Sequence, residues 1–280
     1  MNWFGFAIAT VILNTIYSIL SRVLSVRSCD PRVFTALYNM TGGLMALGLW
    51  LVYPEPLKIP DFRTGAITLL AILSWTLFSR LEFITRKKVE ASVLTIVMRI
   101  GYAIPFAAAI IFFGEPLTNS KIAAMGIIVC ANWLIISARF RKSEVESFRR
   151  PLMMAGALGL GWTLDKVATA HYPTQFYTFL MFFIPGLVNG LTPPMTLRTV
   201  RLELATASWN MPLLALINIA SYMLLMKAFI FGEASSVVLV SSTYYVFAVV
   251  AAVILLKETT HLWRKILAGI LVFSAVIILT

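Results

Sequence analysis

The sequence predicts an all-α integral membrane protein with ten transmembrane helices in two inverted five-helix repeats. Three observations lead to this prediction: an apolar composition, a sequence pattern that occurs twice, and an uneven distribution of Lys and Arg among the connections. We expect the first repeat over residues 1–137 and the second over 152–280, joined by a basic linker at 138–151.

The composition is too apolar for a water-soluble domain of 280 residues. Hydrophobic residues make up 60% of the chain, charged residues only 12%, and the mean hydropathy is +0.88. A hydrocarbon core about 30 Å thick needs roughly 20 apolar residues per helix. Segments of this kind occur ten times, at 3–20, 33–53, 64–83, 91–113, 120–137, 152–170, 174–191, 207–231, 235–256 and 262–280.

The first apolar segment is expected to be a retained helix rather than a cleaved signal peptide. No Lys or Arg precedes it, and no convincing small-residue cleavage site follows it.

Two segments of the chain repeat each other with an offset of 143 residues. The sequence Glu-Ala-Ser occurs at 90–92 and again at 233–235. The same offset aligns Glu115 with Glu258, Lys121 with Arg264, and Gly126 with Gly269. An odd number of helices per half would make the second half enter the membrane from the opposite side, so the repeats are expected to be inverted. Transporters built this way hold their substrate near the middle of the membrane.

Lys and Arg are concentrated on one side of the predicted topology. Only Lys58, Arg63, Lys121 and Lys227 fall on the other side. Connections rich in Lys and Arg stay in the cytoplasm. The linker 138–151 is therefore expected to be cytoplasmic, with both termini outside an inner or plasma membrane. The rich side holds sixteen: Arg22, Arg27, Arg32, Arg86, Lys87, Lys88, Arg139, Arg141, Lys142, Arg149, Arg150, Arg198, Arg201, Lys257, Arg264 and Lys265.

The motifs of enzymes and nucleic-acid-binding proteins are not found. The basic residues lie in short connections and form no separate domain, so no nucleic-acid partner is expected. Cys29 and Cys130 have neither metal-ligand nor disulfide spacing. The sequence shows no nucleotide loop, zinc motif or nucleophile with its base. We therefore expect no cofactor, no metal and no enzymatic activity. A scaffold or a lipid-modifying enzyme is the rival from another class.

The fourth and fifth predicted helices carry a family resemblance. Residues 89–93 read VEASV, Pro105 follows, residues 113–117 read FGEPL, and Gly126 comes after them. This pattern resembles the EamA-type members of the drug/metabolite transporter superfamily. The second copy departs from it at Ala248, at Lys257 and at 259–260. The resemblance implies a metabolite transporter with a cavity lined by helices one, three, four, six, eight and nine. Its ten-helix relatives usually have cytoplasmic termini, whereas the charge distribution here predicts the opposite.

Arg99 lies inside the fourth predicted helix, about 12 Å from the start of that helix. A central Arg costs about 2.5 kcal/mol or more to insert, so we expect it to face a cavity or a partner. Its planar guanidinium suits the carboxylate or phosphate of a substrate. The alternative is a fixed ion pair with Asp165.

Other candidates fall into two groups. The first group lies in the inner part and at the end of the sixth helix and is expected to serve coupling or gating: Asp165, Lys166 and His171. The alternative for Asp165 is a structural ion pair, and the alternative for His171 is an ordinary interfacial residue. Polar and aromatic residues within the spans are expected to line the cavity, and helix–helix contacts are the alternative. Asn14 and Tyr17, three residues apart, share a helix face. The expected substrate-binding residues are Arg99, Tyr102, Asn14, Tyr17, Trp75, Trp162, Asn218, Tyr222 and Tyr245.

Four glutamates, Glu90, Glu115, Glu233 and Glu258, fall at predicted helix ends in both halves, and we expect them to cap or anchor the fold. The most consistent function is a secondary transporter for a small polar, anionic metabolite. The alternative is a proton-coupled exporter of amino acids or amphipathic drugs. The expected partners are a small-molecule substrate and the lipid bilayer, and the oligomeric state is open, a homodimer included.

Overall fold

The computed structural model describes residues 2–89, 91–136, 145–192, 194–244, 246–248 and 262–279. Within these residues the protein is helical and contains no β-strand. The all-α prediction is therefore confirmed for this part of the chain. The helices are α1 (Trp3–Arg27), α2 (Pro31–Val52), α3 (Phe62–Lys88), α4 (Ala91–Ile111), α5 (Asn119–Ile136), α6 (Val145–Ala168), α7 (Thr174–Leu191), α8 (Leu197–Ala207), α9 (Asn210–Phe231), α10 (Ala234–Ser242) and α12 (Leu262–Leu279).

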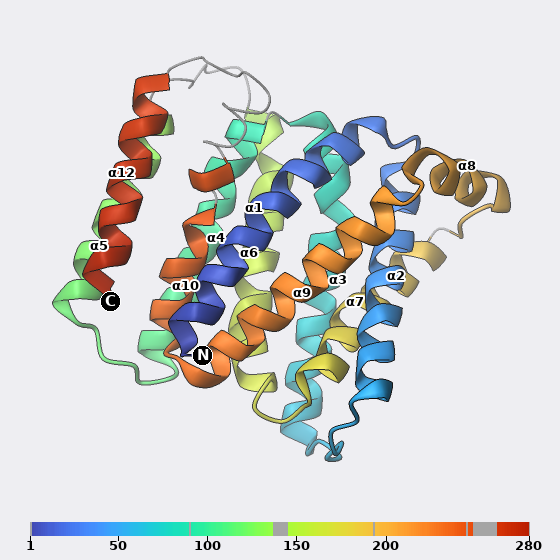
Figure 1. Ribbon diagram of the computed structural model, residues 1–280, viewed down its shortest axis with the longest axis horizontal. Helices are drawn as coiled ribbons and strands as arrows, with labels where there is room; N and C mark the ends of the chain where they lie inside the picture. Colours follow the sequence, from blue (N-terminus) through green and yellow to red (C-terminus); the bar gives the residue numbers. More distant parts are fainter. Residues whose placement is uncertain are drawn as a thin grey trace.

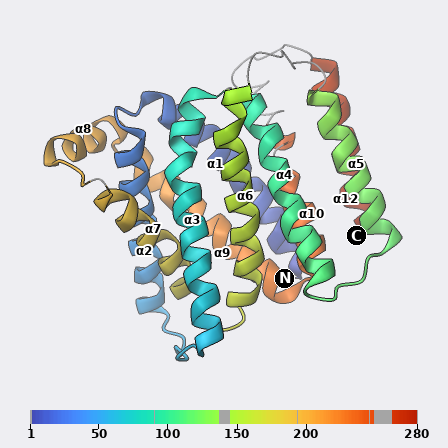
Figure 2. The same ribbon diagram turned by 180° about the vertical axis from the view of Figure 1, so that it is seen from behind.

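The helices form a bundle in which the two halves of the chain interleave (Figure 1). The most extensive helix–helix interfaces all join one half to the other: α2 with α7, α3 and α4 with α6, α1 with α9, and α5 with α12. Seen from behind, α6 lies between α3 and α4 (Figure 2). The halves therefore share one core rather than forming two separate domains.

The outward faces of the bundle are apolar and its interior is partly polar. Among the described helices, α1, α2, α3 and α9 are each long and apolar enough to cross a membrane. Large apolar side chains such as Ile12, Leu70 and Leu216 point outward and are about half exposed. Polar residues such as Asn39 and Asp165 are buried inside. Apolar outward faces are what a lipid solvent requires.

Side-chain caps set the start of several helices. The Asn2 carboxamide accepts from the Gly5 amide at the start of α1, at 3.1 Å. Asp30 accepts from Arg32 N at 3.0 Å before α2, whose first residue is Pro31. Asp61 accepts from Thr64 N at 3.0 Å before α3. Asn and Asp are favoured at these positions because they satisfy amides that have no partner within the helix.

Glycines allow the halves to approach closely. A Cβ atom on Gly101 of α4 would lie 2.4 Å from the Ala155 carbonyl oxygen of α6. A Cβ atom on Gly43 of α2 would lie 2.7 Å from the Phe183 amide nitrogen of α7. Small residues at such crossings are typical of helix packing in membranes.

Two helices run further than the hydrophobic pattern predicted. Helix α1 continues beyond residue 20 to Arg27, and α3 continues beyond residue 83 to Lys88. Arg22 and Arg86, which we assigned to connections, therefore lie within helices. A further helix, α8, occupies the connection between the predicted spans at 174–191 and 207–231. The start of α1 and the end of α12 lie at one end of the bundle, opposite the C-terminal ends of α1 and α3 (Figure 1).

Candidate substrate cavity

A cavity of about 110 Å³ lies in the interior of the bundle, between the two halves. Both halves contribute to its wall, through α1, α2, α3 and α4 from the first and α6, α7, α9 and Tyr244, just after α10, from the second. Its lining residues are Asn14, Tyr17, Ser18, Arg22, Asn39, Trp75, Phe78, Ser79, Glu82, Arg86, Leu94, Met98, Tyr102, Met154, Leu158, Trp162, Met181, Phe182, Asn218, Ser221, Tyr222, Leu225 and Tyr244.

Most of the residues predicted to bind substrate meet at this cavity. Those on its wall are Asn14, Tyr17, Trp75, Tyr102, Trp162, Asn218 and Tyr222. Tyr245 lies outside the described residues, and its neighbour Tyr244 lines the cavity. The structure adds two helices, α2 and α7, to the six that the family resemblance implied.

The side chain of Arg99 also lies outside what the structure describes. On the same helix, Leu94, Met98 and Tyr102 face the cavity and are four residues apart. Arg99 directly follows Met98, so its position on α4 is about 100° from that stripe. Its expected role in binding an anion stays a prediction.

Aromatic rings form much of the wall. Tyr102 and Trp162 meet edge to face with centroids 4.7 Å apart, and they join α4 to α6. Tyr222 of α9 meets Trp75 of α3 at 5.7 Å and Phe182 of α7 at 5.5 Å, both edge to face. Edge-to-face contacts fix ring orientation. The wall is therefore an aromatic surface suited to the apolar part of a ligand.

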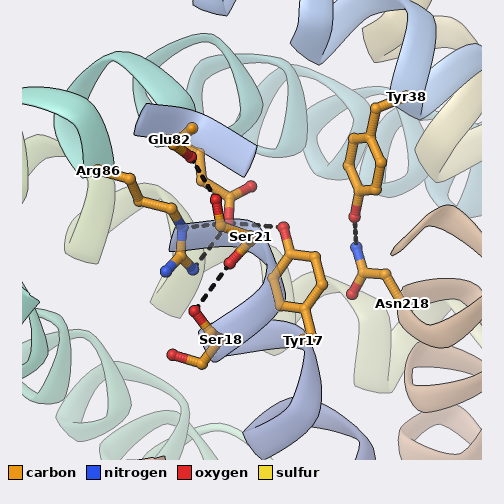
Figure 3. Close-up of polar contacts among 8 residues, drawn as sticks. Tyr17, Ser18, Ser21, Tyr38, Glu82, Arg86 and Asn218 are labelled. Atoms are coloured by element: carbon orange, nitrogen blue, oxygen red, sulfur yellow. Dashed lines mark hydrogen bonds and ion pairs between the residues drawn. The ribbon is translucent and has the colours of Figure 1, made fainter. Parts of the chain in front are cut away.

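The cavity also carries an ion pair that the sequence did not predict (Figure 3). Glu82 and Arg86 lie one turn apart on α3, and Arg86 Nε and Nη2 donate to Glu82 Oε1 at 3.0 and 2.9 Å. The Tyr17 hydroxyl donates to the same oxygen at 2.8 Å. The Arg86 guanidinium carbon lies 5.5 Å from the centroid of the Tyr17 ring. These contacts hold Arg86 at the wall, with only 12% of its side chain exposed.

Tyr38 and Asn218 connect this ion pair to the second half (Figure 3). The Asn218 carboxamide of α9 donates to the Tyr38 hydroxyl of α2. The rings of Tyr38 and Tyr17 stack with centroids 6.3 Å apart. Asn218, Tyr38 and Tyr17 therefore form a chain of contacts from α9 to Glu82 on α3.

Arg22 adds a second positive charge to the lining. Its guanidinium donates to backbone carbonyl oxygens of Arg86 and Val89 at the C-terminal end of α3. A cation at this position complements the partial negative charge of a helix C-terminus. Among the described lining residues, Arg22 and Arg86 are positive and only Glu82 is negative. The wall therefore carries one net positive charge.

Asp165 lies behind the aromatic wall and is fully buried. Trp75 Nε1 donates to both of its carboxylate oxygens at 3.2 Å, and the Tyr177 hydroxyl donates at 2.7 Å. Within the described part of the chain, no Lys or Arg forms an ion pair with it. Three elements, α3, α6 and α7, therefore meet at a carboxylate held by neutral donors.

Lys166 points away from Asp165 to the turn between α9 and α10. Its ammonium donates to the carbonyl oxygens of Phe229 and Gly232, the latter at 2.8 Å. His171, at the far end of this segment, is exposed and does not line the cavity.

Charged residues hold both sides of that turn. The Glu115 carboxylate accepts from the amides of Ala234 at 2.6 Å and Ser235 at 2.9 Å, at the start of α10. Lys121 Nζ lies 2.6 Å from Glu233 Oε2. We call Lys166, Glu115, Lys121 and Glu233 the turn clamp. The expectation that the repeated glutamates cap or anchor helix ends is confirmed for Glu115. Glu233 precedes α10 and pairs with Lys121, and its side chain does not cap the helix. Glu90 and Glu258 lie outside the described residues.

Comparison with known proteins identifies the family. The profile of the EamA-like transporter family matches residues 1–137 and again residues 151–280. A search of curated proteins found no match. A crystal structure described only as that of a protein superposes with a TM-score of 0.76 and 14% identity, covering 99% of this chain and 96% of the other. This likeness supports the fold alone. Because the family profile covers both halves, the chain belongs to the EamA-like transporter family.

Proposed function

We propose that the protein is a secondary transporter that moves a small polar metabolite with an anionic group across a membrane. The observation that carries this proposal is a cavity between the two halves, lined by aromatic rings and a net positive charge. An apolar cavity of about 150 Å³ holds a benzene molecule. A cavity of about 110 Å³ therefore suits a compact ligand of roughly that size or smaller.

Arg86 is the best candidate to bind the anionic group. It is held at the cavity wall by Glu82 and Tyr17, so little side-chain freedom is lost when a ligand binds. Guanidinium groups bind carboxylates and phosphates in a defined geometry. Arg86 thus takes the role that we expected of Arg99, while Asn14, Asn218 and the aromatic wall would orient the rest of the ligand.

Transport would follow from alternating access between two inverted five-helix repeats. The interfaces of α2 with α7 and of α5 with α12 pair helices at corresponding places in the two halves. This pairing supports a two-fold relation between the halves, with ten spans in all. We assign the linker to the cytoplasm and both termini to the outside of an inner or plasma membrane.

Asp165 is the candidate for coupling to protons, because a buried carboxylate among neutral donors binds a proton without losing an ion pair. Lys166 is a candidate for gating because it ties α6 to the turn between α9 and α10. His171 has no comparable contact with the cavity. If Asp165 carries a proton, Asp165→Asn will abolish uptake driven by a pH gradient and retain exchange of substrate at equal pH. Equal loss of both activities would contradict this role.

A proton-coupled exporter of amino acids or amphipathic drugs is the second candidate. Glu82 favours it, because a carboxylate on the cavity wall suits the ammonium group of an amino acid. In this case Glu82 and Arg86 would bind opposite ends of the ligand.

A thermal-shift screen of the purified protein distinguishes the two candidates. Compounds that bind the folded state raise its apparent melting temperature. Organic acids and phosphorylated compounds are expected to stabilise the protein, and amines are not. Stabilisation by amino acids or cationic drugs alone would support the exporter, and stabilisation by no small solute would contradict both candidates.

A further inference from the structure

Helix α8 follows α7 and precedes α9 in the chain, and it lies at the surface of the bundle. It lies at the same end of the molecule as the C-terminal ends of α1 and α3, and it projects sideways beyond α2 (Figures 1 and 2). The chain leaves the bundle after α7 and re-enters it with α9, which is long and apolar enough to cross a membrane. Helix α8 is therefore placed where the membrane meets water.

The exposed side of α8 has the composition of an interfacial helix. Leu197 is 79% exposed, Leu204 is 50% exposed, and Trp209, just after the helix, is 85% exposed. Arg198 and Arg201 are exposed between these apolar residues. Helices with apolar, Trp and Arg side chains on the accessible face lie in the headgroup region of a bilayer.

The acidic residue of α8 is buried, and its two basic residues are exposed. Glu203 is the acidic residue of this helix, and it is 1% exposed and faces the protein. Within the described part of the chain, neither Arg198 nor Arg201 forms an ion pair. The accessible face is therefore cationic, which complements an anionic headgroup.

The buried side of α8 is tied to the helices that carry the cavity. Glu203 Oε1 accepts from the Ser28 hydroxyl at 3.2 Å and from the Asp30 amide, in the turn between α1 and α2. Lys87 Nζ donates to the Ser28 carbonyl oxygen at 2.8 Å, and Lys87 follows Arg86 on α3. A ligand that holds α8 in place would therefore also restrain the ends of α1 and α3.

We propose that α8 is a binding site for anionic phospholipid, with Arg198 and Arg201 contacting the headgroup phosphates. Bound lipid stabilises this end of the bundle through Glu203 and its contacts with the α1–α2 turn. The site is distinct from the substrate cavity, and the proposal does not rest on the proposed transport activity.

The test uses the full-length protein in vesicles of phosphatidylcholine, alone or with about one quarter phosphatidylglycerol. The anionic lipid is expected to raise the melting temperature of the wild-type protein. R198Q/R201Q is expected to bind phosphatidylglycerol roughly thirtyfold more weakly, at about 1 kcal/mol per basic residue near the surface, and to lose most of the shift. The matched control is K58Q/R63Q, which removes two exposed charges at the other end of the bundle and keeps the shift. Both leaflets carry the lipid, so the result does not depend on orientation.

Three outcomes would overturn the proposal. The first is an equal lipid-dependent shift in the wild type and R198Q/R201Q. The second is an equal loss of the shift in K58Q/R63Q. The third is the same shift when soluble glycerol phosphate is added to phosphatidylcholine vesicles, because that result assigns the site to a free phosphate. If R198Q/R201Q does not fold, R198K/R201K replaces it as the test variant. R198K/R201K keeps both charges and is expected to retain the lipid-dependent shift in melting temperature. Loss of that shift in R198K/R201K would contradict a headgroup site.

Discussion

The charged residues at the cavity and those of the turn clamp differ in what their partners are. Glu82 and Arg86 bind each other on one helix, and both face the cavity. In the clamp, Lys166 binds carbonyl oxygens at the end of α9 and Glu115 binds amides at the start of α10. Lys166 and Glu115 thus satisfy helix ends and complement their partial charges, while Lys121 pairs with Glu233. The comparison indicates that the first pair is available to a ligand, whereas the second holds elements of the fold together.

Removing the positive charge from the cavity is expected to have the largest effect. Arg86→Gln will weaken binding of an anionic ligand about a hundredfold, because a charged hydrogen bond is lost and Glu82 is left without its cation. Equilibrium binding of a labelled ligand measures the change. Arg80→Gln is the matched control, because Arg80 lies on the same helix, is exposed and does not line the cavity. Equal affinity in the wild type and Arg86→Gln would place the anion site elsewhere, with Arg99 the next candidate.

Exchanging the two charges sharpens the comparison. The double variant Glu82→Arg/Arg86→Glu keeps an ion pair one turn apart and moves the cation along the wall. If the pair binds ligand, the variant will regain the melting temperature lost in Arg86→Gln and will not regain affinity. Recovery of both properties would show that the pair is structural.

Removing a clamp carboxylate is expected to lower stability and leave selectivity unchanged. Glu115→Ala leaves the amides of Ala234 and Ser235 without their acceptor. Loss of a capping side chain costs about 1–2 kcal/mol, so the apparent melting temperature will fall by a few degrees. Ranking several ligands by the thermal shift they cause checks selectivity. A different order of ligands in Glu115→Ala would show that Glu115 contributes to ligand binding.

The smallest effect is expected at the Lys121–Glu233 ion pair. The Glu233 side chain is 47% exposed, so solvent screens its interaction with Lys121. Glu233→Gln will therefore lower stability by about 1 kcal/mol or less. Thermal unfolding of the two variants, Glu233→Gln and Glu115→Ala, compares their stability. A larger fall in melting temperature for Glu233→Gln than for Glu115→Ala would contradict the expected order.

The sequence predicted those parts of the site that lie well inside apolar segments. Asn14, Tyr17 and Trp162 were identifiable because polar and aromatic residues stand out within a hydrophobic helix. Arg86 was missed because it begins the basic run Arg86-Lys87-Lys88, which is typical of a connection. In the structure α3 continues through this run, and Glu82 turns Arg86 toward the cavity. A Glu and an Arg four residues apart were the available signal.

The helical fold and its two-part organisation were predictable from hydropathy and from the offset of 143 residues. Helix α8 was not predictable from hydropathy, because its eleven residues are too few to cross a membrane and only three of them are leucine. Its position depends on Glu203, whose partners Ser28 and Asp30 lie in the other half of the chain. Contacts between distant residues of this kind leave no periodic pattern in the sequence.

The most direct test of the account is exchange of an anionic ligand across proteoliposome membranes. Vesicles carrying the wild-type protein, preloaded with unlabelled ligand, are expected to take up labelled ligand faster than empty vesicles. Arg86→Gln vesicles will show little of this stimulation, and Arg80→Gln vesicles will match the wild type. Equal uptake by vesicles with and without the protein, for a ligand that binds it, would contradict transport through this cavity.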